Sequence, residues 1–313
     1  MPYDSLTNRT DAAALIPEDA ASEILTATTE QSVVLSSFRT VNMSNNVTRM
    51  PALAALPTAY FVNGDTGLKQ TTDVSWENKY LNVEEIAAIM PVPEAVLDDA
   101  DYDIWAEARP FLAEAIGRTL DAAVFFGENA PAAWPDDIQT ATAAAGSQYT
   151  YTTSAAADGG VAEDINQTMM LVEGDGFDVN GFVTYRGFRG IIRGARSTDG
   201  QKLMDVSQDE MEGAPVRYGM SGLWPDTATI GNPLLYAGDW SQYMVGIRQD
   251  MSWKVLDQAV IQDNTGAIVY NLAQQDMVAL RVVARFAWQV ANTINYSNET
   301  AGTRSPVAAL IQA

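Results

Sequence analysis

Residues 97–127 read LDDADYDIWAEARPFLAEAIGRTLDAAVFFG, and this stretch carries the strongest helical pattern of the chain. Its apolar residues recur at spacings of three and four, which predicts a helix with one face buried against a core. Aspartates crowd its beginning at 98–103, where carboxylates favour the positive end of the helix dipole. Gly127 is a natural stop for the helix, whereas Pro110 inside the pattern predicts a kink or a restart.

Two segments that precede this helix have little core of their own. Residues 1–56 predict an extended arm, because a polar start is followed by one short apolar stripe and by proline punctuation. Such an arm buries little against itself and is expected to lie on something else. Residues 57–93 predict a long hairpin, with a strand candidate at 59–62, turn residues at 63–67 and a return from Trp76. Because its polar middle cannot be buried on both faces, we expect the hairpin to project.

The second half of the chain mixes helices and strands. A helix is expected at 163–173, a strand at 181–185 and a short helix at 186–196. Residues 198–237 are rich in glycine and proline and show little periodicity. Several strands are expected after residue 243, and 276–290 has the β-branched content of a closing strand, although a helix also fits its pattern.

Composition removes many functions. The chain has 313 residues, 40 acidic and 18 basic side chains, a formal net charge of -22, and neither His nor Cys. Catalysis by Ser-His-Asp or Cys-His groups, Cys/His zinc sites, iron–sulfur clusters and disulfides are therefore excluded. Carboxylates, Lys, Tyr, Ser and Thr remain for chemistry, as do metals with oxygen ligands. The acid excess argues against a basic surface that wraps nucleic acid.

Targeting signals are not expected either. The N-terminus lacks a basic stretch followed by an apolar one, which argues against a signal peptide. No apolar run approaches about 20 residues, so no membrane span is predicted.

Candidate sites are few. The aspartates at 98–103 have oxygen atoms that suit Ca²⁺ or Mg²⁺, but a solvated helix start explains them better. A catalytic lysine needs burial to lower its pKa, and Lys69 lies in the polar middle of the hairpin. No phosphate-binding loop, dinucleotide fingerprint or nucleophile elbow is present. We assign no catalytic residue, cofactor or metal.

Arginines and aromatic residues point to contacts between subunits. Arg186, Arg189, Arg193 and Arg196 stand at helical spacing and could bind phosphate or nucleic acid. In so acidic a protein they are better explained as partners of carboxylates on a neighbouring subunit. The many Trp and Tyr residues suggest interface anchors, and contact roles are expected among Trp134, Trp224 and Trp240.

The order of parts resembles the major capsid protein family of tailed bacteriophages, whose fold is shared with encapsulins and herpesvirus capsid floors. The similarity extends over about residues 16–296. It is carried by many weak matches in the right order: the arm from Ile16-Pro17 to Met50-Pro51, the return from Trp76 to Pro93 followed by Leu97-Asp98-Asp99, the helix end Asp121 to Gly127, Gly213-Ala214-Pro215-Val216, Leu235 to Ser241, and 276–285.

This resemblance implies an α+β phage major capsid protein fold and a structural, non-enzymatic role. The implied parts are an N-terminal arm at 1–56, an extended β-hairpin loop at 57–93, a peripheral domain at 94–165 and 238–300 with its spine helix at about 98–127, an axial domain at 166–237, and a C-terminal tail at 301–313. Pentamers and hexamers would close into an icosahedral shell around double-stranded phage DNA. The shell would be part of the virion and would assemble in the host cytoplasm.

The resemblance also implies partners and contact residues. Scaffolding protein and portal are the expected partners, with decoration proteins as further candidates and no membrane. The implied subunit-interface residues are Lys69, Trp76, Arg186, Arg189, Arg193 and Arg196. Some family members join a loop Lys to an Asn of a neighbour; Lys69 lies in the matching loop and Lys79 on its return strand.

Two alternatives stay open from the sequence. An encapsulin-type shell would use the same fold to enclose a cargo enzyme. A carboxylate-based hydrolase or lyase would require a concave pocket in which Asp and Glu side chains converge.

Overall fold

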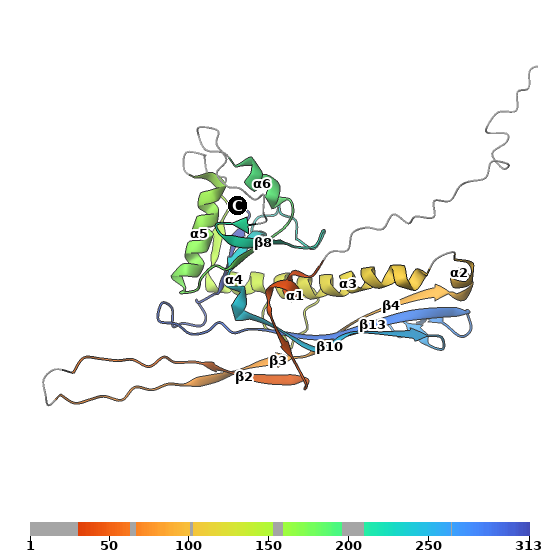
Figure 1. Cartoon of the computed structure of the whole chain (residues 1–313), viewed down its shortest axis with the longest axis horizontal. Coiled ribbons are helices and arrows are strands. Elements are labelled where there is room, and N and C mark those ends of the chain that lie inside the picture. Colours follow the sequence, from red (N-terminus) through yellow and green to blue (C-terminus); the bar gives the residue numbers. More distant parts are fainter. Residues whose placement is uncertain (1–30, 63–66, 101–102, 153–158, 196–209, 264) are drawn as a thin grey trace, which may run out of the picture.

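The elongated half of the molecule consists of a four-stranded sheet with the long helix α3 (Ile104–Phe126) along one face (Figure 1). We analysed a computed structural model that describes residues 31–62, 67–100, 103–152, 159–195, 210–263 and 265–313. β1 pairs in parallel with β10, and β10, β13 and β4 pair antiparallel. The strands, in spatial order, are β1 (Arg39–Asn42), β10 (Tyr243–Leu256), β13 (Met277–Val290) and β4 (Glu84–Pro93).

A six-stranded sheet with helices around it forms the other half, above one end of α3 in Figure 1. In spatial order its strands are β5 (Gln148–Thr150), β14 (Val307–Ile311), β9 (Pro233–Gly238), β6 (Gly181–Thr184), β8 (Ala214–Tyr218) and β7 (Glu210–Met211). The accompanying helices are α4 (Ile138–Ala145), α5 (Gly160–Gly174) and α6 (Phe188–Gly194). Buried Ile165 packs α5 onto the sheet, and buried Phe188 and Ile192 pack α6 onto it.

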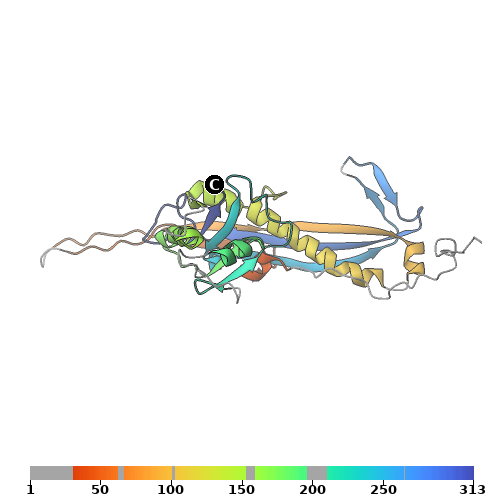
Figure 2. The same ribbon diagram turned by 90° about the horizontal axis from the view of Figure 1, so that it is seen from above.

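Two hairpins extend from the body. β2 (Val47–Leu53) pairs with β3 (Trp76–Asn82), and the limbs beyond them run side by side to the left in Figure 1. The limbs contain no strand among their described residues, so the strand expected at 59–62 is absent; the Tyr60 hydroxyl donates to the Gln70 carbonyl instead. The second hairpin is β11 (Val260–Gln262) with β12 (Ile268–Asn271), seen in blue at the upper right of Figure 2.

The long helix begins and ends with the signals that its sequence carries. The Asp103 carboxylate caps it by accepting from the backbone N–H of Trp105 at 2.9 Å. Gly127 ends it in the left-handed conformation, at a φ of 69°. The helix runs through Pro110 without the restart that the sequence suggests. Asp98 and Asp99 belong to the preceding short helix α2 (Glu94–Asp99).

The main core lies where α3 meets both sheets. Phe38, Phe125, Trp240 and Tyr243 form an aromatic cluster there, with ring centroids 5.1 to 6.3 Å apart. Trp240 belongs to the 3-10 helix η3 (Trp240–Gln242), and its indole N–H donates to the Gly181 carbonyl at 3.0 Å. Because a buried indole N–H needs a partner, this bond holds the ring inside the fold.

Three tryptophans expected at contacts between subunits are tied into the chain itself. Trp134 and Trp240 are buried. The half-buried Trp224 donates its indole N–H to the Pro233 carbonyl, and Trp134 donates to the Asn82 carbonyl. The proximity of these residues to loop signals therefore reflects packing of loops on the core.

The C-terminus differs from the expected tail at 301–313. β14 lies between β5 and β9, and Val307 to Leu310 are fully buried. Arg304, also buried, holds the loop before this strand by donating to the carbonyl oxygens of Asn292 and Asn298. The end of the chain is therefore an interior strand, because its apolar run completes the six-stranded sheet. The segment 276–290, which left helix and strand open, is a strand.

Candidate functional site

The base of the long hairpin is docked on the body through one face. Leu81 is buried against Met43 and Ala287, with Met50 and Val83 packed around them. Side chains on paired strands alternate between the two faces, so this contact fixes which residues point outward. Docking through one face leaves the other face of β2 and β3 in solvent.

The outward face of the hairpin carries apolar side chains, which we call the hairpin face: Val47, Trp76 and Tyr80. Trp76 is 68% exposed, and Val47 and Tyr80 are also exposed. Further along the limbs, Phe61 is 105% and Leu68 is 91% exposed. Apolar groups gathered on a projecting element are typical of an interaction surface. Of the interface residues predicted from sequence, Trp76 lies on this face and Lys69 lies exposed beside Leu68.

Lys79 faces the body, unlike Lys69. Its ammonium donates to the Val290 carbonyl at 3.2 Å. Burial lowers the pKa of Lys79 and the Arg304 charge lowers it further, while Glu77 partly offsets both. Lys79 therefore joins the hairpin to the end of β13.

The predicted arginine stripe is distributed over several surroundings. Arg186 precedes α6 and is exposed, as is Arg193 in its last turn. Arg189 is half-buried, and its guanidinium lies over the Tyr218 ring, 5.6 Å from the centroid. Arg196 lies outside the described residues. The helix itself is anchored by other residues, since Phe188 and Ile192 enter the core of this half.

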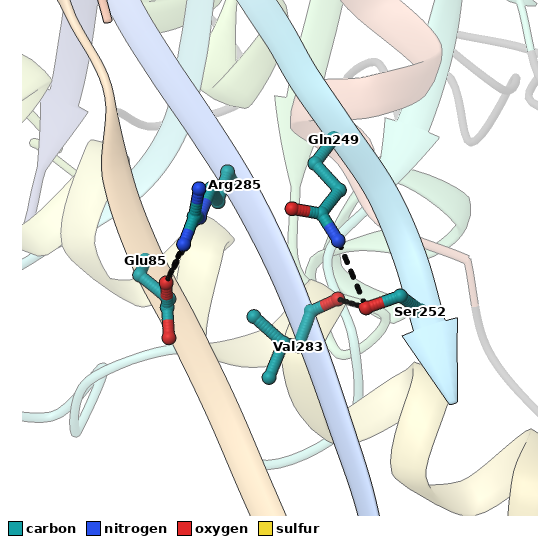
Figure 3. Close-up of polar contacts among 5 residues, drawn as sticks. All are labelled: Glu85, Gln249, Ser252, Val283 and Arg285. Carbon is teal, nitrogen blue, oxygen red and sulfur yellow. Dashed lines mark hydrogen bonds and ion pairs between the residues drawn. The ribbon is translucent and has the colours of Figure 1, made fainter. Parts of the chain in front are cut away.

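Polar contacts lie in the middle of the four-stranded sheet, where the pairing of β10 with β13 is irregular (Figure 3). Arg285 forms an ion pair with Glu85 on the neighbouring strand, 2.7 Å between Nη2 and Oε2. Gln249 donates to the Ser252 hydroxyl at 2.9 Å, and that hydroxyl donates to the Val283 carbonyl at 3.3 Å. The register of β10 against β13 shifts between Gln249 and Ser252. Such bulges bend a strand and increase its twist.

The best-formed groove of the described residues does not bring carboxylates together. The groove between α1 (Val33–Ser37) and α3 has a volume of about 460 Å³, and Leu35, Pro110, Met220 and Met251 are among its largely apolar lining. Glu114 is its sole carboxylate residue among the described residues. Within the described ranges, no three acidic side chains come close enough to hold a metal ion. No described helix is both long and apolar enough to cross a bilayer.

Comparison with known proteins identifies the family to which a chain with this fold belongs. Residues 12–294 match the model of the phage capsid family, so the chain belongs to this family. It is a major capsid protein of a bacteriophage, a structural component of the virion shell.

Individual relatives support the assignment. The major capsid protein of Staphylococcus phage 80alpha is 24% identical over 274 residues, which cover 86% of this chain and 79% of that protein. A solved chain of Microbacterium phage Oxtober96 is 37% identical with a TM-score of 0.85, covering 99% of this chain and 100% of its own length. A chain of Mycobacterium phage Bobi is 31% identical with a TM-score of 0.86, covering 99% of both chains. The resemblance and the α+β capsid fold inferred from the sequence are confirmed.

Proposed function

We propose that copies of this chain assemble into pentamers and hexamers that close into an icosahedral shell around double-stranded phage DNA, without catalysis. The observation that carries the proposal is the hairpin, whose Phe61, Leu68 and Trp76 are exposed and enter no core formed by the described residues. An apolar projection of this kind is stabilised when it lies on a neighbouring copy. Closed symmetry lets one self-complementary chain supply the repeated contacts of a shell.

The parts of the chain take distinct roles in this proposal. The arm expected at 1–56 ends before β1 in this proposal, because β1 lies in the four-stranded sheet and β2 pairs with β3 at the base of the hairpin. The extended loop expected at 57–93 becomes β2, β3 and the limbs between them, since β4 lies in the four-stranded sheet. That sheet with α3 serves as the peripheral domain. The six-stranded sheet serves as the axial domain around five-fold and six-fold axes. We assign α4, β5 and β14 to the axial domain as well, because α4 and these strands pack in that half.

The charge of the chain suits an enclosed genome. A net charge of -22 favours a shell with an acidic inner wall, and such a wall would not trap densely packed DNA. Sequence-specific recognition of DNA is not part of the proposal. Scaffolding protein and portal are the proposed partners during assembly in the host cytoplasm, and decoration proteins are proposed for the finished shell.

The exposed arginines of the axial half have a proposed role in ring contacts. In this proposal Arg186 and Arg193, which are exposed, pair with carboxylates of the next copy in a pentamer or hexamer, and the exposed Glu210 is one candidate partner. Such rim pairs fix register and partner choice and add little affinity. Arg189 contributes through its contact with Tyr218, which fixes α6 against β8.

A pair of variants at Trp76 tests the assembly. The full-length chain is purified as wild type, Trp76→Asp and Trp76→Phe, and each is measured by circular dichroism, sedimentation velocity and negative-stain microscopy. Wild type and Trp76→Phe are expected to form closed particles. Trp76→Asp is expected to keep its secondary structure but to stop at monomers or single capsomers, because a charge cannot be buried in an apolar contact.

Two results would count against the proposal. A compact, stable wild-type monomer under all assembly conditions would contradict the proposal that the chain forms a shell. Normal closed particles of Trp76→Asp would show that the hairpin face is not buried between subunits.

A further inference from the structure

Asp121 is a fully buried carboxylate in the second half of α3, surrounded by the apolar residues of the main core. Its oxygens accept from the Ser32 hydroxyl at 2.5 Å and from the backbone N–H groups of Val33 at 2.9 Å and Val34 at 3.1 Å. All three donors lie about 90 positions away in sequence. A buried carboxylate is costly, and these hydrogen bonds offset that cost.

The donors belong to the first turn of α1, the element that directly follows the N-terminal 30 residues. Ser32 is the N-cap of α1, and its hydroxyl oxygen also accepts from the Leu35 N–H at 3.2 Å. A helix of five residues has no stability of its own in water. The position of α1 therefore depends on what holds it.

Arg217 holds the other end of α1. Its guanidinium, on β8 of the six-stranded sheet, donates to the Ser36 carbonyl. An acidic group at the first turn and a basic group at the last both match the helix dipole. The two groups come from different halves of the molecule, so α1 bridges α3 and the six-stranded sheet. Val33, Val34 and Phe38 also hold α1 in place, because their side chains are buried in the main core.

We propose that Asp121 is a positioning residue for assembly: it fixes α1, the point at which the N-terminal arm joins the body, at one place on the spine helix in every subunit. The inference rests on the proposed function, because only an arm that contacts other copies needs a fixed point of attachment. A carboxylate suits this task better than an apolar residue. It accepts three bonds in one geometry, whereas apolar packing alone tolerates sliding of a short helix.

Hydrogen exchange of the full-length chain tests the bridge without reference to assembly. In the Asp121→Asn variant the amide nitrogen faces one of the two backbone donors, so one bond is lost and the charge-assisted character of the others disappears. The rate of hydrogen exchange at the Val33 and Val34 amides is expected to rise at least about tenfold, because hydrogen bonds to a charged group are lost. Amides of α3 itself are expected to exchange as in wild type.

Asp164→Asn is the matched control. Asp164 is also fully buried on a helix, and its oxygens accept from the Thr152 hydroxyl and N–H, far from α1 in the six-stranded half. This variant is expected to leave exchange at Val33 and Val34 unchanged. If Asp121→Asn fails to fold, Ser32→Ala removes a single donor and is expected to raise the same exchange by a smaller factor.

Assembly of the same variants completes the test. Asp121→Asn is expected to yield open or aberrant particles, and Asp164→Asn closed ones. Unchanged exchange at Val33 and Val34 would overturn the bridge, and normal closed particles from Asp121→Asn with fast exchange would overturn its positioning role. A wild type that forms no particles would contradict the proposed function instead, while the exchange result would still judge the bridge.

Discussion

Replacing Asp121 by Asn should change how stability depends on pH, in a direction set by the burial of the carboxylate. Burial raises the pKa of Asp121 from 3.8 to about 6, and the hydrogen bonds from Ser32, Val33 and Val34 only partly oppose this rise. The folded chain therefore binds a proton more readily than the unfolded chain. The resulting contribution to stability is complete below pH 3.8 and is lost as pH rises through about 6.

The size of the effect follows from the shift in pKa. A difference of about two units corresponds to about 3 kcal/mol between the fully protonated and fully ionised limits. About half of this stability is already lost below pH 5. Between pH 5 and pH 8 the stability of wild type should therefore fall by about 1.5 kcal/mol because of this group. The amide that replaces the carboxyl group in Asp121→Asn does not titrate, so the variant should lose none of it.

Urea denaturation of the unassembled protein, followed by tryptophan fluorescence at both pH values and one ionic strength, measures the difference. Every other titrating group is common to the two proteins and cancels in the comparison. The free energy of unfolding of Asp121→Asn minus that of wild type should therefore be about 1.5 kcal/mol higher at pH 8 than at pH 5, so the variant gains relative stability as pH rises. A relative stability that stays constant with pH, or moves in the opposite direction, would refute the reasoning.

Three further outcomes are expected. Gly238→Ala should destabilise the fold by about 1–3 kcal/mol in thermal unfolding, because the new Cβ would lie 2.6 Å from the Pro306 carbonyl and 2.4 Å from Val307 Cγ2; an unchanged melting temperature would contradict the tight packing of β14. Glu85→Gln should change stability by less than about 1 kcal/mol, since both partners of its ion pair are exposed, and a loss above about 2 kcal/mol in urea would be inconsistent with this. Arg193→Glu should remain folded and soluble but give aberrant or open particles by electron microscopy; normal closed shells would make its side chain only a solvated one.

The long helix could be predicted from sequence because its signals are local. Asp103, the apolar periodicity and Gly127 all act within the helix or one turn beyond it. The long hairpin was predictable for the opposite reason, since so polar a middle has no other place than solvent. Its limbs are not strands near 59–62, because pairing stops at Leu53 and Trp76.

The parts that escaped prediction depend on distant partners. Residues 307–311 are a short apolar run, and only β5 and β9 on either side make it a strand. The choice between helix and strand at 276–290 is likewise decided by pairing with β10 and β4. Asp121 stood in the apolar end of the predicted helix. The spacing of the apolar residues does not mark its side chain as buried, and its donors at 32–34 cannot be found from spacing either.

The predicted contact residues divide in the same way. Trp76 and Lys69 are exposed as a projecting hairpin requires. Trp134 and Trp240 lie inside because their indole N–H groups find carbonyl partners across the fold, which no local pattern reveals.

Electron cryomicroscopy of particles formed by the purified full-length chain tests the central claim most directly. We expect closed icosahedral shells of pentamers and hexamers, in which Trp76 and Phe61 of each copy are buried on a neighbour. A population of compact monomers, with the hairpin folded against its own body and no closed shell under any assembly condition, would contradict it.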